Sequence, residues 1–210
     1  QDIQFHISGG RVLHARRVLN SESGSASGAL GAVPDELPGL IELDFPVELA
    51  SAVAGPDAVE RDGHADWVSA RECFPECLAA HPDAIVEVGR NRMDVVIEVT
   101  PAAFAALGAP DLTRMKQMPH RVVIVTCRAD WGANREQAAD FLSRAFAPGV
   151  GVDEDPVCGS AHCALGPWWL ARGICPDEEC GGQIYMRAKQ MSQRGGSLLV
   201  RVHGDRCFLA

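Results

Sequence analysis

Residues Asp153 to His162 read DEDPVCGSAH, and no other part of the 210-residue chain indicates the fold as clearly. Three acids stand before Pro156, and a nearly continuous apolar stretch begins at Gly159 and continues to about Arg172. A stretch that is apolar on almost every side is typical of a helix buried in a core. We therefore expect a central helix over residues 159–172 that starts directly after an acidic turn.

The start of this predicted helix combines groups that suit an anionic ligand. Unpaired first-turn amides and the helix dipole favour negative charge, and Gly159 permits a close approach of the backbone. We expect a substrate carboxylate at Gly159, Ser160 and Ala161, with Asp155 and Ser160 as catalytic candidates. The alternative is that Asp155 or Ser160 only caps the helix, which is the commoner use of these residue types.

Cys158 and His162 complete the set of candidate catalytic residues. A helix N-terminus lowers the pKa of a thiol, and histidine acts as an acid or base near neutral pH. The competing interpretations are an inert core cysteine and a hydrogen-bonded core histidine. Because the two residues are four apart on one helix, a Cys-His acyl-transfer enzyme is a further hypothesis, although no third orienting group is evident.

Pro167 lies inside the predicted helix. Proline there removes a backbone donor and costs about 3 kcal/mol if nothing compensates for it. We expect a kink near Cys163 and tertiary contacts that override the propensity.

Most of the remaining chain has the patterns of strands rather than helices. Alternating or β-branched segments predict strands at residues 4–7, 12–18, 41–45, 85–88, 93–99, 121–127, 184–188, 197–202 and 206–209. Turns are expected at residues 8–10, 89–91 and 203–205.

Five further segments have less regular patterns. The expectations are a flexible loop at residues 21–31, a turn or helix within 46–57, a strand with a short helix at 67–80, a short helix at 101–107, and a helix or buried strand at 136–146.

Composition argues against several functional classes. The net charge is −9 and no basic stripe exists, so we expect no nucleic-acid partner. Every apolar run is broken before the roughly 18 residues that cross a bilayer, so we expect no membrane partner and a cytoplasmic location. The eight cysteines lack the spacing of a zinc site or a dense disulfide framework, so we expect reduced thiols and no metal.

The signature segment and its surroundings resemble the PhzF-like (phenazine biosynthesis-like) family. The resemblance rests on Phe146 to Pro148 (FAP), Gly151 to His162 (GVDEDPVCGSAH) and Leu165 to Trp169 (LGPWW). Supporting segments follow in family order: FHISGGRVLHARR at 5–17, LDFP at 43–46, RVVIVTC at 121–127 and QRGGSLLVRVHGD at 193–205.

The resemblance implies an α+β fold like that of diaminopimelate epimerase, with two pseudo-symmetric domains. In each domain an antiparallel-rich sheet wraps around a central helix, and the site lies between the domains. The implied division is a partial first domain at residues 1–48, a complete second domain at 49–195 and C-terminal strands at 196–210.

The resemblance also implies a cofactor-independent isomerase or epimerase that transfers a proton at carbon on a small carboxylate-bearing substrate. Asp155 and Ser160 would line the site, and Cys158 stands where the family often has threonine, whereas related epimerases carry a catalytic cysteine in a similar turn. A homodimer is one option for the assembly.

One departure from the family pattern opens a second hypothesis. The family's N-terminal glutamate base and its Gly-His-Ala-Thr helix start have no match in this sequence, so we expect a truncated chain with an incomplete site. The alternative function is that of a non-catalytic fragment or homologue that binds a ligand or a partner.

Overall fold

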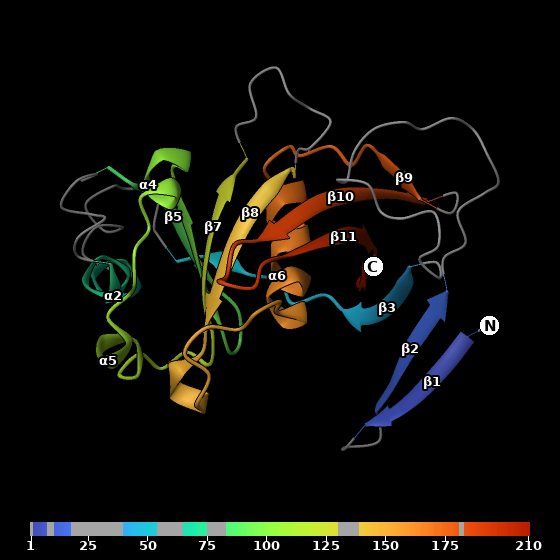
Figure 1. Ribbon diagram of the computed structural model, residues 1–210, viewed down its shortest axis with the longest axis horizontal. Coiled ribbons are helices and arrows are strands. Elements are labelled where there is room, and N and C mark those ends of the chain that lie inside the picture. The colour runs from blue at the N-terminus through green and yellow to red at the C-terminus, as the bar shows by residue number, and fades with distance from the viewer. Residues whose placement is uncertain are drawn as a thin grey trace.

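The computed structural model describes residues 2–7, 11–17, 40–53, 65–74, 83–129, 139–180 and 183–210, and a single twisted sheet dominates it (Figure 1). The strands are β1 (Asp2–Ile7), β2 (Arg11–Arg17), β3 (Ile41–Pro46), β4 (Ser51–Ala52), β5 (Ile85–Arg90), β6 (Val95–Val99), β7 (Val123–Arg128), β8 (Phe141–Phe146), β9 (Glu178–Cys180), β10 (Gln183–Gln190), β11 (Gly196–His203) and β12 (Arg206–Leu209).

The strand order across the sheet is β1-β2-β3-β12-β11-β10-β8-β7-β6-β5-β4, and β9 pairs with β10 outside this path. Only β6 with β7 and β8 with β10 run parallel among the described pairs. The early strands β2 and β3 reach the C-terminal strands because β3 pairs with β12. The antiparallel-rich sheet that we predicted is confirmed.

The helices are α2 (Ala65–Cys73), α4 (Pro101–Ala105), α5 (Leu112–Met115) and α6 (Gly159–Leu170), with a 3-10 turn η2 (Pro148–Val150). Helix α6 lies against the middle of the sheet, whereas α2, α4 and α5 gather beyond β5 and β7 (Figure 1). The prediction of a buried central helix at this position is confirmed. Within the described ranges, no helix is long and apolar enough to cross a membrane.

Alternating side chains divide the sheet into two packed faces. In β7, Val123 and Val125 join the cluster that contains α2, α4 and α5, while Ile124 joins the cluster around α6. The α6 cluster also receives side chains from β6, β8, β10, β11 and β12. A strand buried on both faces reads as a continuous apolar run, which is why RVVIVTC predicted β7 correctly.

Two predicted local structures are wrong. Residues 65–73 form the helix α2 where we expected a strand first. The turn between β5 and β6 lies after Arg90, because Oδ1 of Asn91 accepts the amides of Met93 and Asp94 and forms the turn there.

The remaining predictions divide between observed elements and undescribed residues. Residues 141–146 are the strand β8, one of the two options that we gave, and residues 51–52 form the short strand β4. The predicted flexible loop at 21–31, the turn at 8–10 and residues 75–80 lie outside the described residues.

Helix α6 continues through Pro167. Proline has no N–H to donate to the carbonyl of Cys163, four residues earlier. That carbonyl accepts a hydrogen bond from the backbone N–H of Glu48 instead, at 3.2 Å. The contact expected to offset the proline therefore comes from the segment that follows β3; the kink itself stays a prediction.

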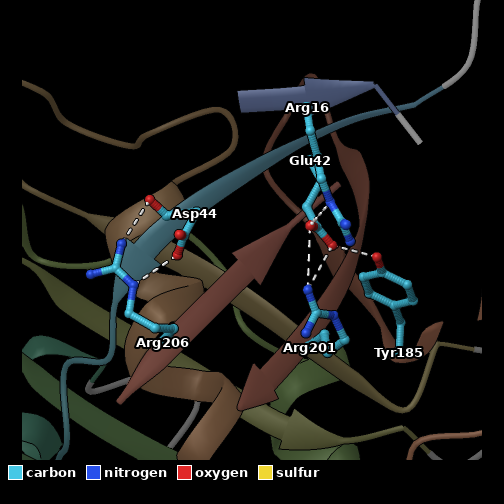
Figure 2. Close-up of polar contacts among 6 residues, drawn as sticks. All are labelled: Arg16, Glu42, Asp44, Tyr185, Arg201 and Arg206. Carbon is cyan, nitrogen blue, oxygen red and sulfur yellow. Dashed lines mark hydrogen bonds and ion pairs between the residues drawn. The ribbon is translucent and has the colours of Figure 1, made fainter. Parts of the chain in front are cut away.

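A buried acid joins four strands (Figure 2). It lies on the face of the sheet opposite α6, because the alternate residues Met186 and Val200 pack in the α6 cluster. Glu42 of β3 is 1% exposed and lies between Arg16 of β2, Arg201 of β11 and the hydroxyl of Tyr185 of β10. Burial raises the pKa of Glu42, but the hydrogen bonds from Arg16 and Tyr185 and the positive charges of Arg201 and Arg16 together outweigh it, so the pKa falls below its usual range. The neighbouring Asp44 on the same strand binds Arg206 of β12 nearer the surface.

Candidate functional site

The signature segment connects β8 to α6 and is held in place by its own backbone. Ala147 pairs with Val152 in an isolated bridge, and Gly151 takes the left-handed φ of 87° that this tight turn requires. The amide of Asp155 then donates to the carbonyl of Ala145 in β8, at 2.9 Å. These bonds return the chain to the sheet just before the helix begins.

The three acids of the segment have different environments. Glu154 forms a two-pronged ion pair with Arg144, at 2.8 and 3.0 Å, and Arg144 also donates to the carbonyls of Leu107 and Gly108. Asp155 is partly exposed and accepts the amide of Val157 through Oδ1 at 3.0 Å. Asp153 is exposed. Glu154 thus anchors the loop through Arg144, whereas Asp155 has no such ion pair among the described contacts and lies close to the helix start.

Gln190, at the end of β10, fixes the last residues before the helix. Its side chain is fully buried; Oε1 accepts the amide of Cys158 at 2.8 Å, and Nε2 donates to the carbonyl of Asp155 at 2.5 Å. Ser192 adds a hydrogen bond from its hydroxyl to the carbonyl of Pro156. The geometry of residues 155–158 therefore depends on a strand that lies later in the chain.

The capping interpretation of Asp155 and Ser160 is wrong. The N-cap residue is Cys158, in extended conformation and without a side-chain capping bond, and Ser160 lies inside the first turn. Asp155 bonds to Val157, which precedes the helix. The side chains of Asp155 and Ser160 therefore do not cap the first-turn amides, and the binding of a carboxylate by these amides stays a prediction.

Cys158 is a protonated thiol rather than a thiolate. Burial raises its pKa above the ordinary value, and the nearby carboxylates of Asp155 and Asp94 act in the same direction. The hydroxyl of Ser160, 3.4 Å from Sγ, and the backbone amide of Ala161 lower the pKa of the thiol but do not outweigh the burial. Desolvation therefore prevails over the effect that we expected from the helix N-terminus.

His162 points into the core and is 0% exposed. Its Nδ1 lies 2.8 Å from the carbonyl of Cys158, which can only accept, so Nδ1 carries the proton. Nε2 is then the acceptor, and Ser143 donates to it across 3.4 Å. Burial lowers the pKa of His162 to about 4, so the ring is neutral at physiological pH.

The structure thus supports the interpretation of His162 as a hydrogen-bonded core histidine. Its ring contacts the carbonyl of Cys158 and not the thiol, so the two side chains do not form a nucleophile and base pair. The predicted catalytic role of His162 is not tested by these contacts alone, but they suit a residue that holds the helix start in position.

Besides Cys158, Ser160 contacts an ion pair that the sequence did not suggest. Asp94, just before β6, is 1% exposed and accepts two hydrogen bonds from Arg121, at 2.9 and 2.6 Å. Nη2 of Arg121 also lies 3.3 Å from Oγ of Ser160. Asp94 and Arg121 are distant from the signature segment in sequence. The parallel pairing of β6 with β7 places the two residues beside each other, and Arg121 reaches the segment through its contact with Ser160.

The structure therefore brings Asp155, Cys158 and Ser160 together at the start of α6, with Gly159 and Ala161 in the same turn. A Cβ at residue 159 would meet only Leu209 within 4 Å, at an ordinary 3.7 Å, so the importance of Gly159 for a bound ligand stays a prediction. Among the described residues, no group of three or more acids, histidines or cysteines is arranged to hold a metal ion. The six cysteines with described side chains are free thiols.

The sequence profile described as "Phenazine biosynthesis-like protein" matches residues 10–207. The chain belongs to the phenazine biosynthesis-like family. An uncharacterized isomerase of Pseudomonas aeruginosa is 35% identical over 168 residues, which are 80% of this chain and 52% of that protein. An uncharacterized isomerase of Halalkalibacterium halodurans is 39% identical over 122 residues, which are 58% of this chain and 41% of that protein.

A solved structure gives the same family assignment. The crystal structure of a PhzF-family phenazine biosynthesis protein from Enterococcus faecalis has a TM-score of 0.61 at 26% identity, covering 99% of this chain and 60% of that one. The predicted α+β fold of the phenazine biosynthesis-like family is confirmed. The chain spans about half the length of the curated relatives it matches, and the predicted domain boundaries stay predictions.

Proposed function

We propose that this chain forms the carboxylate-binding and proton-relay part of a cofactor-independent isomerase or epimerase site. The substrate is a small carboxylic acid. A proton leaves one of its carbons while the electron pair of the C–H bond stays on the substrate, and a proton returns to the same carbon or to another one. The observation that carries this proposal is the uncapped start of α6 with Ser160 and Asp155 beside it.

The charges around the helix start favour Asp155 as the proton relay. Asp94 and Glu154 are each held by an arginine through two hydrogen bonds, so their carboxylates are engaged. Asp155 accepts one backbone amide and is partly exposed. It is therefore the carboxylate of this group best placed to exchange a proton with a substrate.

Ser160 and the first-turn amides are proposed to bind the substrate carboxylate. The amides point along the helix axis, where the dipole adds about half a positive charge. Cys158, as a protonated thiol, is proposed to donate its hydrogen bond to Oγ of Ser160, 3.4 Å away, and not to attack as a nucleophile. His162 is proposed to hold the Cys158 carbonyl in place from inside the core.

Deuterium exchange tests the proposal. The chain is incubated in D₂O with a panel of D- and L-amino acids and conjugated carboxylic acids, and incorporation at carbon is followed by NMR and mass spectrometry. We expect incorporation into at least one acid, and a loss of about 100-fold or more in Asp155→Asn, the magnitude typical of a lost acid or base. Asp153→Asn, an exposed neighbour in the same acidic run, is the control and should exchange normally. Absence of exchange with every acid would refute turnover by this chain.

Ligand binding without turnover is the second candidate function. The burial of Cys158 and His162, which keeps both side chains neutral, favours it. A chain that binds a simple carboxylate at the start of α6 but exchanges no deuterium would support this function over the isomerase.

A further inference from the structure

Arg121 contacts the proposed site although it lies outside the signature segment. Its Nη2 is 3.3 Å from Oγ of Ser160, and the same guanidinium is bound to Asp94 by two hydrogen bonds. The structure assigns Arg121 as a positioning residue that directs the hydroxyl of Ser160 toward the substrate carboxylate. This assignment deepens the proposed function and rests on it.

The direction of the Ser160 hydroxyl follows from the groups around it. A guanidinium has donors but no acceptor, so Arg121 donates to Oγ of Ser160 and occupies one of its lone pairs. The thiol of Cys158, 3.4 Å from the same oxygen, is suited to fill the second lone pair. The proton on Oγ then points away from both neighbours and is free for a carboxylate oxygen.

Asp94 fixes the guanidinium before any ligand arrives. The carboxylate of Asp94 is buried, and both its oxygens bind Arg121 in the planar two-pronged geometry. The backbones are joined too, because the amide of Arg121 donates to the carbonyl of Met93 at 2.7 Å, and the amide of Val95 donates to the carbonyl of Val122 at 3.0 Å. Such preorganisation lowers the entropy cost of orienting a reactant.

The competing explanation is that Arg121 only neutralises the buried Asp94. That role requires no contact with Ser160, so it predicts that the effects of changing the ion pair and changing Ser160 are independent. A positioning role predicts the opposite: without the Ser160 hydroxyl, Arg121 has nothing to direct.

The experiment removes the ion pair in two backgrounds. Asp94→Asn with Arg121→Met removes both charges together, because Arg121→Met alone would leave a buried carboxylate unpaired. This paired change is made in the natural chain and in Ser160→Ala. The matched control is Asp44→Asn with Arg206→Met, since the Arg206 side chain is 35% exposed and that of Arg121 is 34% exposed.

Benzoate, a simple carboxylate, is the probe, and its affinity is measured by NMR titration. We expect the paired change to weaken binding about 10-fold or more in the natural chain and about 2-fold or less in Ser160→Ala, consistent with the loss of one charge-assisted hydrogen bond. The control pair should bind benzoate normally. Arg121→Lys, which keeps the charge and a donor, should weaken benzoate binding less than the paired change does.

Three results would overturn the assignment: equal losses in the two backgrounds, no loss in either, or no binding of benzoate by the natural chain. If the paired variant does not fold, the comparison of Arg121→Lys in the two backgrounds decides in the same way. The outcome of the deuterium experiment is independent of the outcome of the benzoate experiment. Coupled benzoate binding without exchange keeps the positioning role and removes the isomerase, whereas exchange without coupling does the reverse.

Discussion

Replacing Glu42 with alanine is expected to destabilise the fold far more than the same change at Asp44, although both acids lie on β3 and bind arginines (Figure 2). Glu42 is buried and joins β3 to β2, β10 and β11. Asp44 is partly exposed, and within the described part of the chain its side chain binds Arg206 alone. The comparison therefore isolates the effect of burial on an ion pair.

The magnitude follows from the partners that alanine would leave behind. The Tyr185 hydroxyl is fully buried and would lose its acceptor, at about 1–3 kcal/mol. The side chain of Arg201 is 14% exposed and would keep an uncompensated charge, whereas Arg16, at 45%, adds about 1 kcal/mol or less. Together these place Glu42→Ala at about 3–5 kcal/mol and Asp44→Ala at about 0–1 kcal/mol.

Urea unfolding followed by tryptophan fluorescence measures the difference. With a slope of about 2 kcal/mol per molar, the midpoint should fall by about 2 M for Glu42→Ala and by less than about 0.5 M for Asp44→Ala. Similar midpoint shifts for the two variants would show that the buried cluster does not hold the early strands to the sheet.

Three further predictions concern the site and the core. In the unfolded chain a histidine takes up a proton below its ordinary pKa of about 6.5, whereas the pKa of folded His162 is about 4, so the free energy of unfolding should fall as the pH falls from about 6.5 to about 4. In urea titrations at these two pH values, His162→Phe should lose about 3 kcal/mol less of this free energy than the natural chain does. Gln190→Ala should lower the free energy of unfolding by about 2–4 kcal/mol, because two buried hydrogen bonds are lost, and the exposed Gln193→Ala is its control. Gly89→Ala should melt at a clearly lower temperature, with a cost of about 1–3 kcal/mol, because its Cβ would lie 2.2 Å from the Trp168 ring; Gly108→Ala, which meets nothing within 4 Å, should not. A Gly89→Ala melt equal to that of Gly108→Ala, or matching acid sensitivity in His162→Phe, would contradict the packing and the burial described above.

The sequence predicted the parts of the fold that local periodicity controls. The apolar run of β7 and the nearly uniform hydrophobicity of α6 are visible within a dozen residues, and both elements were confirmed. The strand expected before residue 73 was wrong because α2 is only weakly amphipathic, so no local period identifies it.

The site was predicted only where its residues are consecutive. Asp155, Cys158 and Ser160 belong to one segment, whereas Arg121 and Gln190 reach it through strand pairing that no local pattern reveals. One signal did exist: Met186, Ala188 and Gln190 share the inner face of β10, and a glutamine on an apolar face requires buried partners. The thiol state of Cys158 depended on burial, which residue type alone does not give.

Pro167 makes the interior of one helix specify a contact with a distant segment. Because the proline cannot donate, the Cys163 carbonyl is a vacant acceptor facing the chain that follows β3, and Glu48 occupies it. An alanine at residue 167 would restore the helical donor, so two amides would compete for one oxygen. The connection from β3 to β4 would then be held less firmly, although the helix itself would have a better intrinsic propensity. A helix-breaking residue in the centre of this fold thus stabilises a contact outside its own helix.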